Sequence, residues 1–183
     1  MERSSQLRKL TTMGMMAAVS IILVYLIHFP IFPAASFLEY DPADIPIFIC
    51  TFLYGPLSGF ILTVIVSFIQ GFTVSAQSGM MHIFATGFFT IVAGNMYKNH
   101  RNKKSAVKAL VVGSIIMVLM MCIWNIVFTP IFMGTPRDVV MAMIVPIIIP
   151  FNAIKAGVNS LITFLIYKKI ANHIPHGQAI KDN

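Results

Sequence analysis

Long apolar runs separated by short basic clusters are the feature that most constrains the fold of this chain. The runs begin near Leu10 and continue, with brief interruptions, to the pair Lys168-Lys169. A helix needs about 20 apolar residues to cross a membrane. Only 10% of the 183 residues are charged, whereas soluble domains contain about 25%. The sequence therefore predicts an all-α integral membrane protein.

The breaks in the apolar pattern predict one six-helix domain over 1–183. We expect helices over 10–29, 44–54, 57–70, 80–97, 107–132 and 145–167. Gly55-Pro56 separates the second helix from the third, and this break puts the N-terminal basic residues and the cluster at 98–108 on one side. Basic clusters mark the cytoplasmic side. Both termini are thus predicted to be cytoplasmic in a multi-pass protein of the cell membrane.

The net charge of +7 does not indicate nucleic acid as a partner, because the basic residues flank the apolar runs. A signal peptide is the alternative for the first run, but Leu10 to Ile27 is longer than the usual 7–15 residues of a signal core. Cys50 and Cys122 lie within apolar runs, so neither a disulfide nor a metal site is expected.

Lys155 is the most costly residue in the last apolar run, because a charge inside a membrane must be paired or reach water. Asn152, Lys155 and Asn159 share one helix face, since their spacing is i, i+3, i+7. We expect this face to border a polar cavity in the outer half of the membrane. The alternatives are snorkelling of Lys155 to the interface, pairing with Asp41 or Asp44, and an interhelical hydrogen bond for Asn159.

Other polar and aromatic residues fall at the same predicted depth. The candidate substrate-binding residues are Asn125, Asn152, Lys155, His82, Gln70, Tyr40 and Trp124. Amide side chains donate and accept hydrogen bonds, and aromatic rings stack on a flat heterocycle. His82 could instead be a hydrogen-bonded residue at a helix end, and Trp124 a packing residue of the core. Both alternatives stay open.

Signatures of catalysis are absent from the sequence. It has no HExxH, GxSxG or GxxxxGK[ST] motif, so neither an enzyme nor a chain that hydrolyses ATP is indicated. We also expect no carboxylate pair among the helices and find no internal repeat, two features typical of ion-coupled carriers. No cofactor or metal is predicted. The pattern favours a protein that binds a small molecule.

Four segments carry a family resemblance: YDPADIPIF at 40–48, YGPLSG at 54–59, HIFATGFF at 82–89 and PFNAIKAG at 150–157. Together they resemble the substrate-binding S components of energy-coupling factor (ECF) vitamin transporters, nearest the riboflavin-type group. The resemblance implies a bundle that captures a vitamin, with ATP used by two ATPase subunits that act through a transmembrane coupling subunit. It also implies that Asn125, Asn152 and Lys155 bind the flavin ring.

The resemblance further implies that small residues of the first helix dock on the coupling subunit. Gly14 and Ala18 fit this spacing and Ala17 is adjacent, although packing inside the bundle is an alternative. The segment 66–79 departs from many riboflavin-type members, because it lacks their Lys-Asn pair.

That departure leaves pyridoxine or hydroxymethylpyrimidine open as ligands of a smaller pocket closed by Gln70, Ser75 and His82. The Gly- and Ser-rich segment 71–79 is expected to form a mobile loop. An alternative of another class is a membrane scaffold without transport activity.

Overall fold

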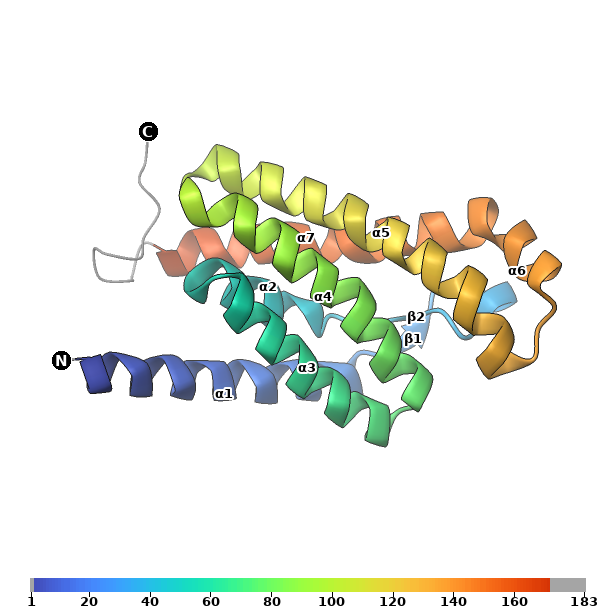
Figure 1. Ribbon diagram of the computed structural model, residues 1–183, viewed down its shortest axis with the longest axis horizontal. Helices are drawn as coiled ribbons and strands as arrows, with labels where there is room; N and C mark the ends of the chain where they lie inside the picture. Colours follow the sequence, from blue (N-terminus) through green and yellow to red (C-terminus); the bar gives the residue numbers. More distant parts are fainter. Residues whose placement is uncertain (1, 172–183) are drawn as a thin grey trace.

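Helices run lengthwise along an elongated bundle in the computed structural model, which describes residues 2–171 (Figure 1). Five candidate spans are long and apolar enough to cross a membrane within these residues. The helices are α1 (Glu2–Leu26), α2 (Asp44–Tyr54), α3 (Pro56–Thr73), α4 (Ala76–Asn99), α5 (Lys103–Met133), α6 (Arg137–Met143) and α7 (Ile149–Ala171). Helix α2 is apolar but has only 11 residues, so the number of six spans stays a prediction.

The last span is longer than the sequence predicts. The expected helix over 145–167 is preceded by α6, and the π-helical turn Ile144–Ile148 joins α6 to α7. Pro146 and Pro150 lack the backbone N–H that an α-helix needs. A π turn is a known way to accommodate such interruptions. The chain therefore stays helical where the prolines suggested a loop.

Gly55 and its neighbours explain why α2 and α3 are separate helices. Gly55 has a φ of +91°, which only glycine adopts readily, and Pro56 begins α3. A Cβ on Gly59 would lie 2.9 Å from Thr51 Cβ, and one on Gly94 would lie 2.8 Å from Pro56 Cα. The YGPLSG segment thus lets α2, α3 and α4 approach closely at this turn, where the sequence predicted a break.

Between α1 and α2 the chain forms a small hairpin. The two-residue strands β1 (Phe29–Pro30) and β2 (Glu39–Tyr40) pair antiparallel, with Phe29 opposite Tyr40. The short 3-10 helix η1 (Pro33–Ala35) lies between them. The sequence predicted a loop between the helices over 10–29 and 44–54, and the paired strands in it were not predicted.

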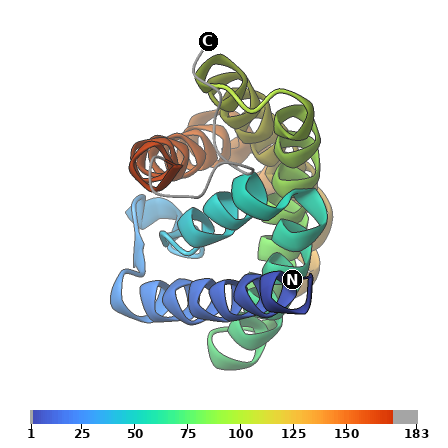
Figure 2. The same cartoon turned by 90° about the vertical axis from the view of Figure 1, so that its left-hand side faces the viewer.

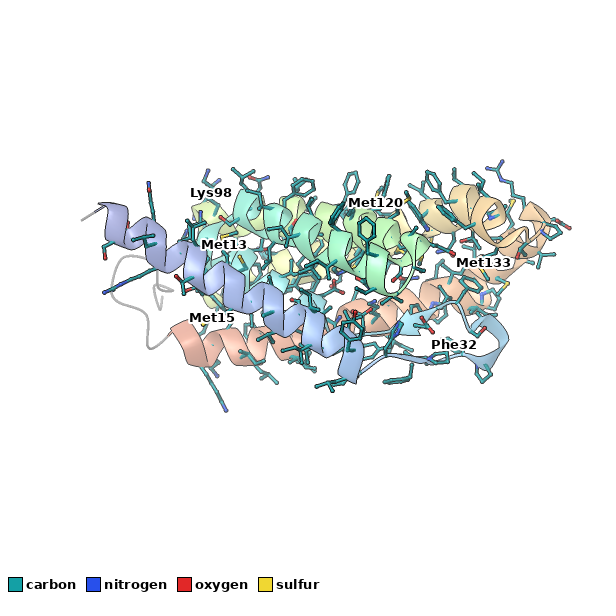
Figure 3. The ribbon with its side chains drawn as sticks, turned by 90° about the horizontal axis from the view of Figure 1, so that it is seen from below. Met13, Met15, Phe32, Lys98, Met120 and Met133 are labelled. Carbon is teal, nitrogen blue, oxygen red and sulfur yellow. The ribbon has the colours of Figure 1, made fainter. Side chains whose placement is uncertain are left out.

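The two ends of the bundle differ in composition. The start of α1, the α4–α5 turn and the end of α7 lie at one end, which we call the basic end, and Lys98 is labelled there (Figures 1 and 3). The α3–α4 turn and α6 lie at the other, which we call the hairpin end. Viewed along the bundle, α1 lies at its edge (Figure 2). The expected gathering of the basic clusters at one end is therefore present.

Aromatic rings fill the core toward the basic end. Phe48 of α2 stacks on Phe89 of α4 at 3.6 Å between ring centroids, and Phe52 stacks on Tyr97 at 4.5 Å. Tyr167 of α7 meets both Phe52 and Tyr97 edge-on. These contacts join α2, α4 and α7.

Candidate ligand-binding site

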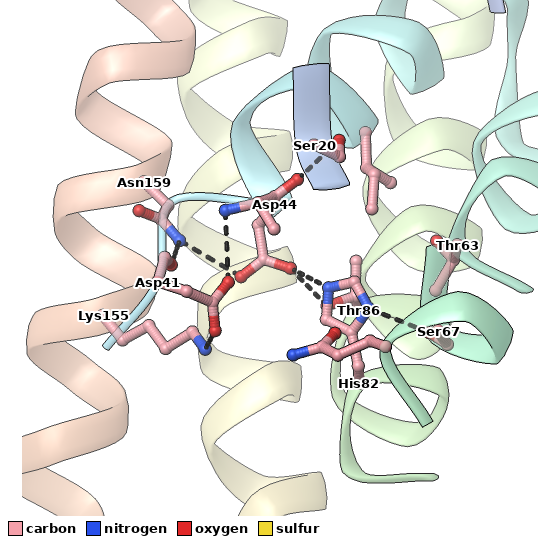
Figure 4. Close-up of polar contacts among 12 residues, drawn as sticks. Ser20, Asp41, Asp44, Thr63, Ser67, His82, Thr86, Lys155 and Asn159 are labelled. Atoms are coloured by element: carbon pink, nitrogen blue, oxygen red, sulfur yellow. Dashed lines mark hydrogen bonds and ion pairs between the residues drawn. The ribbon is translucent and has the colours of Figure 1, made fainter. Parts of the chain in front are cut away.

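The most deeply buried charge of the described chain is the carboxylate of Asp44 at the start of α2. It accepts hydrogen bonds from His82 Nε2 at 2.9 Å, from Asn159 Nδ2 at 3.1 Å and from the Thr86 hydroxyl, and it has no exposed surface (Figure 4). The partial positive charge at the N-terminus of α2 adds to this stabilisation. Because α2 is short, its first residue lies inside the bundle. Asp44 thus joins α2, α4 and α7.

Lys155 is compensated by an ion pair with Asp41. The distance from Lys155 Nζ to Asp41 Oδ2 is 2.7 Å, and the two side chains are 13% and 4% exposed (Figure 4). The Ala43 amide also donates to Asp41, at 3.1 Å, and Asn159 Nδ2 lies 3.3 Å from the Asp41 carbonyl oxygen. Pairing is therefore what makes the charge of Lys155 tolerable.

His82 has a hydrogen-bond partner at each ring nitrogen. Its Nδ1 lies 2.8 Å from Ser67 Oγ, while Nε2 faces Asp44. A carboxylate only accepts, so Nε2 carries a proton, and a neutral ring accepts at Nδ1 from the Ser67 hydroxyl. The arrangement fixes the orientation of the ring at the wall of a cavity.

A cavity of about 170 Å³ lies beside this polar network, toward the hairpin end. Four of the seven candidate residues line it: Gln70, His82, Asn152 and Lys155. Its remaining lining comes from the hairpin, the α3–α4 turn and the helix faces opposite: His28, Phe37, Leu38, Glu39, Asp41, Ser75, Gln77, Ser78, Met81, Ala85, Thr86, Met117, Met121 and Phe151. The site therefore combines the Lys155–Asp41 ion pair, a contact of 2.8 Å between His28 Nε2 and Glu39 Oε2, several amides and an apolar floor.

Asn125 and Trp124 lie outside this lining. Asn125 is fully buried, donates to its own helix at Met121 O over 2.8 Å, and accepts from Thr129 over 3.0 Å. Trp124 stacks on Phe128 with 4.2 Å between ring centroids. The packing interpretation describes Trp124 in this conformation, because its ring lies among aromatic neighbours.

Tyr40 also lies outside the lining, although it is close to the network. Its hydroxyl donates to Asn159 Oδ1 at 3.0 Å, and its ring lies 5.6 Å from that of Phe29. Burial raises the pKa of the Tyr40 hydroxyl above its ordinary value, against the opposing effect of Lys155. Tyr40 therefore stays a neutral donor at neutral pH and holds Asn159 in place.

Two buried carboxylates of the site were not predicted from the sequence. Asp41 and Asp44 were considered only as alternative partners of Lys155, with no acidic pair expected among the helices, whereas both side chains are buried. The available signal was YDPADIPIF, in which two acids directly precede an apolar helix. The sequence did not show that this helix, α2, begins inside the bundle.

The expected mobile loop at 71–79 is mostly helical. Gly71 lies in α3 and Gly79 in α4, and a Cβ on Gly79 would lie 2.7 Å from Gly71 Cα. These glycines therefore permit a close crossing of α3 and α4, and the mobility of the segment stays a prediction. The turn consists of Val74 and Ser75, and the Ser75 hydroxyl caps α4 by accepting from the Ser78 amide at 3.1 Å.

The small residues of α1 divide between two faces. A Cβ on Gly14 would meet nothing within 4 Å, and Ala18 is exposed, so both lie on an open surface. Ala17 packs instead against the cluster that contains Met13 and Ile47. The docking prediction is thus compatible with the positions of Gly14 and Ala18, while Ala17 faces inward.

No group of three or more metal-ligating side chains occurs among residues 2–171. Cys50 and Cys122 are both free thiols. The polar network with its cavity is therefore the strongest candidate site in the described part of the chain.

Comparison with known proteins identifies the family of this chain. The family model described as ECF transporter, substrate-specific component, matches residues 8–167. The chain belongs to this family. As an ECF substrate-specific component it is a membrane transport protein, which replaces the scaffold alternative.

The riboflavin transporter RibU of Staphylococcus aureus is 30% identical, with 92% of this chain and 93% of the relative covered. The riboflavin transporter FmnP of Bacillus subtilis is 27% identical, with 90% and 93% covered. A solved S component of a bacterial ECF transporter matches with a TM-score of 0.81 and 28% identity, over 93% of this chain and 99% of that one. An S component for biotin, 21% identical with a TM-score of 0.63, shares the fold.

Proposed function

We propose that this chain is the S component that captures riboflavin for an ECF importer in the cell membrane. The hairpin end then faces the outside, and both termini are cytoplasmic, as the basic clusters favour. The single observation that carries the proposal is the similarity to two riboflavin transporters over nine-tenths of the chain.

Lys155 and Asn152 are the groups that we expect to contact the ligand first, since both line the cavity on one face of α7. The Lys155 ammonium has three donors, and Asp41 uses one of them in the ion pair. The others are available to ligand oxygen or ring nitrogen atoms. Asp41 then positions Lys155, and the Lys155 ammonium interacts with both Asp41 and the bound vitamin.

The cavity volume makes a second candidate worth testing. About 170 Å³ is below the roughly 300–1,000 Å³ of most small-molecule pockets. A flavin therefore needs the hairpin segment Phe37–Asp41 to move outward, whereas pyridoxine or hydroxymethylpyrimidine requires less room. Asn125, Trp124 and Tyr40 contact a ligand only after such a rearrangement, and their binding roles remain predictions.

The partners follow from the family. We propose that a transmembrane coupling subunit docks on the open face of α1 at Gly14 and Ala18, and that two ATPase subunits supply the energy. This chain has no phosphate-binding loop of its own. Its role is then to bind and release a vitamin without catalysing a reaction.

Titration of the purified protein with riboflavin tests the proposal, with flavin fluorescence as the signal. We expect saturation at one riboflavin per chain and no displacement by excess pyridoxine, hydroxymethylpyrimidine or biotin. Saturable binding of pyridoxine or hydroxymethylpyrimidine without riboflavin binding would favour the second candidate. Binding of none of the four would overturn both.

A further inference from the structure

A second, larger hollow lies between α5 and α7 on the outer surface of the bundle. It has a volume of about 640 Å³ and runs along α5 from Val107 to Cys122 and along α7 from Ile149 to Phe164. Fifteen residues of helix correspond to about 22 Å, which exceeds one leaflet, about half of a 30 Å hydrocarbon core. We call this hollow the α5–α7 groove.

Small residues of α7 create the groove. Ala153, Gly157 and Ser160 follow each other at i, i+4 and i+7, and a Cβ on Gly157 would meet nothing within 4 Å. The hydroxyls of Ser114 and Ser160 lie 2.9 Å apart and satisfy each other. The rest of the lining is apolar apart from the Cys122 thiol, so the groove suits a hydrocarbon chain.

Basic residues continue both walls of the groove at the basic end. Lys104 lies three residues before Val107 on α5, and Lys168 lies four residues after Phe164 on α7. Each lysine is therefore on the same helix face as the groove residue and one turn beyond it, toward the basic end. Both side chains are exposed. An apolar groove that ends between two lysines matches the two parts of an anionic phospholipid.

We propose that the α5–α7 groove binds one anionic phospholipid, with an acyl chain between the helices and the phosphate between Lys104 and Lys168. Within a bilayer a hydrocarbon chain gains little by leaving other chains. The charges therefore select the lipid, as they do in basic pockets between other membrane helices. The proposal is independent of which vitamin the cavity binds.

A second copy of the chain fits the groove less well. Two copies inserted in one orientation would bring the lysines of both grooves to the same membrane face, where like charges repel. A zwitterionic phospholipid also has a phosphate, but its own ammonium group offsets that charge, so two lysines attract it less than they attract an anionic lipid. Charge complementarity thus favours the anionic lipid over both.

Native mass spectrometry of the whole chain tests the proposal after equilibration with equimolar phosphatidylglycerol and phosphatidylcholine of identical acyl chains. We expect one phosphatidylglycerol to be retained in clear preference. Lys104→Gln combined with Lys168→Gln should lower this preference about tenfold, given the contribution of lysines near anionic headgroups. Lys98→Gln, at the same end on α4, is the matched control and should change little.

Gly157→Leu should fill the groove without a clash and remove the retained lipid, while the melting temperature stays equal or rises. Equal retention of both lipids by the unmodified chain would overturn the proposal. A Lys98→Gln variant that lowers the preference as much as the double variant does would also overturn it. A mass spectrum that shows a dimer of the chain without bound lipid would do so as well.

Discussion

The same helices are held together by aromatic packing at the basic end of the bundle and by a polar network toward the hairpin end. At the basic end α2 packs between α4 and α7 through aromatic rings, as where Phe52 of α2 stacks on Tyr97 of α4. Toward the hairpin end the polar network of Asp41, Asp44 and Lys155 replaces the rings, and the cavity lies beside it. The difference arises because α2 has 11 residues, or about 16 Å, and so occupies only part of the bundle length.

A shortened helix can thus divide one bundle into a packed part and a binding part. Substitutions in the packed part should change stability and leave ligand affinity of the folded protein unchanged. Substitutions beside the cavity should change affinity, with stability effects wherever a buried charge loses its partner. The following variants test this division, with riboflavin as the ligand.

Phe52→Ala should have the largest effect on stability. Phe52 is 1% exposed and contacts both Tyr97 and Tyr167, and removing such a ring costs about 3–5 kcal/mol. Denaturation in detergent measures this loss. Phe68→Ala, at an exposed position on α3, is the control and should cost far less. A tenfold loss of affinity in folded Phe52→Ala protein would break the proposed division.

Asp44→Asn should lower the free energy of unfolding by about 2–3 kcal/mol, because the amide cannot accept all the hydrogen bonds of a buried carboxylate. His82, Thr86 and Asn159 would then compete for one acceptor oxygen. Denaturation again provides the measurement. Asp138→Asn, at an exposed position of α6, is the matched control. Equal stability of the two variants would mean that the network of Asp44 does not hold the helices.

Tyr40→Phe should have a smaller effect, about 1 kcal/mol of stability, since it removes one hydrogen bond to Asn159. Riboflavin affinity should change by less than about twofold if Tyr40 acts only through Asn159. A titration that shows a tenfold weaker affinity would instead place Tyr40 in contact with the vitamin, as its pattern in the sequence suggested.

Gly14→Leu and Ala18→Leu should have the smallest effect on the isolated protein, because both positions are open. We expect stability and affinity to stay unchanged while assembly with the coupling subunit, measured by co-purification, is lost. Val19→Leu on another face of α1 is the control. Full vitamin uptake by both variants would locate the docking surface elsewhere.

Helix positions were the part of the fold that the sequence predicted well. Apolar length and the Gly55-Pro56 break place five of the six helices to within about four residues, because both depend on local properties of the chain. Helix α1 is the exception, since it begins at Glu2 and ends at Leu26, whereas 10–29 was predicted. The hairpin and the π turn at Ile144–Ile148 were not predicted. Each depends on contacts with other parts of the bundle.

The site was predicted in part for the same reason. Asn152 and Lys155 share a helix face by their spacing alone, and both line the cavity. Asp41 was not assigned to the site, because its partner Lys155 is 114 residues away in the sequence. Asn125 was assigned by depth, yet it lies outside the lining of the cavity.

Lys155 is proposed to bind the vitamin as well as to pair with Asp41. Riboflavin titration of Lys155→Met and of the double variant Lys155→Met with Asp41→Asn, each with a melting temperature, tests this double role. The single variant should lose stability because Asp41 is left buried without its partner, and the double variant should recover most of it. Both should bind riboflavin about ten- to a hundredfold more weakly, as expected for a lost hydrogen bond to a charged group. A double variant that binds with unchanged affinity would contradict the proposal and leave Lys155 with a structural role alone.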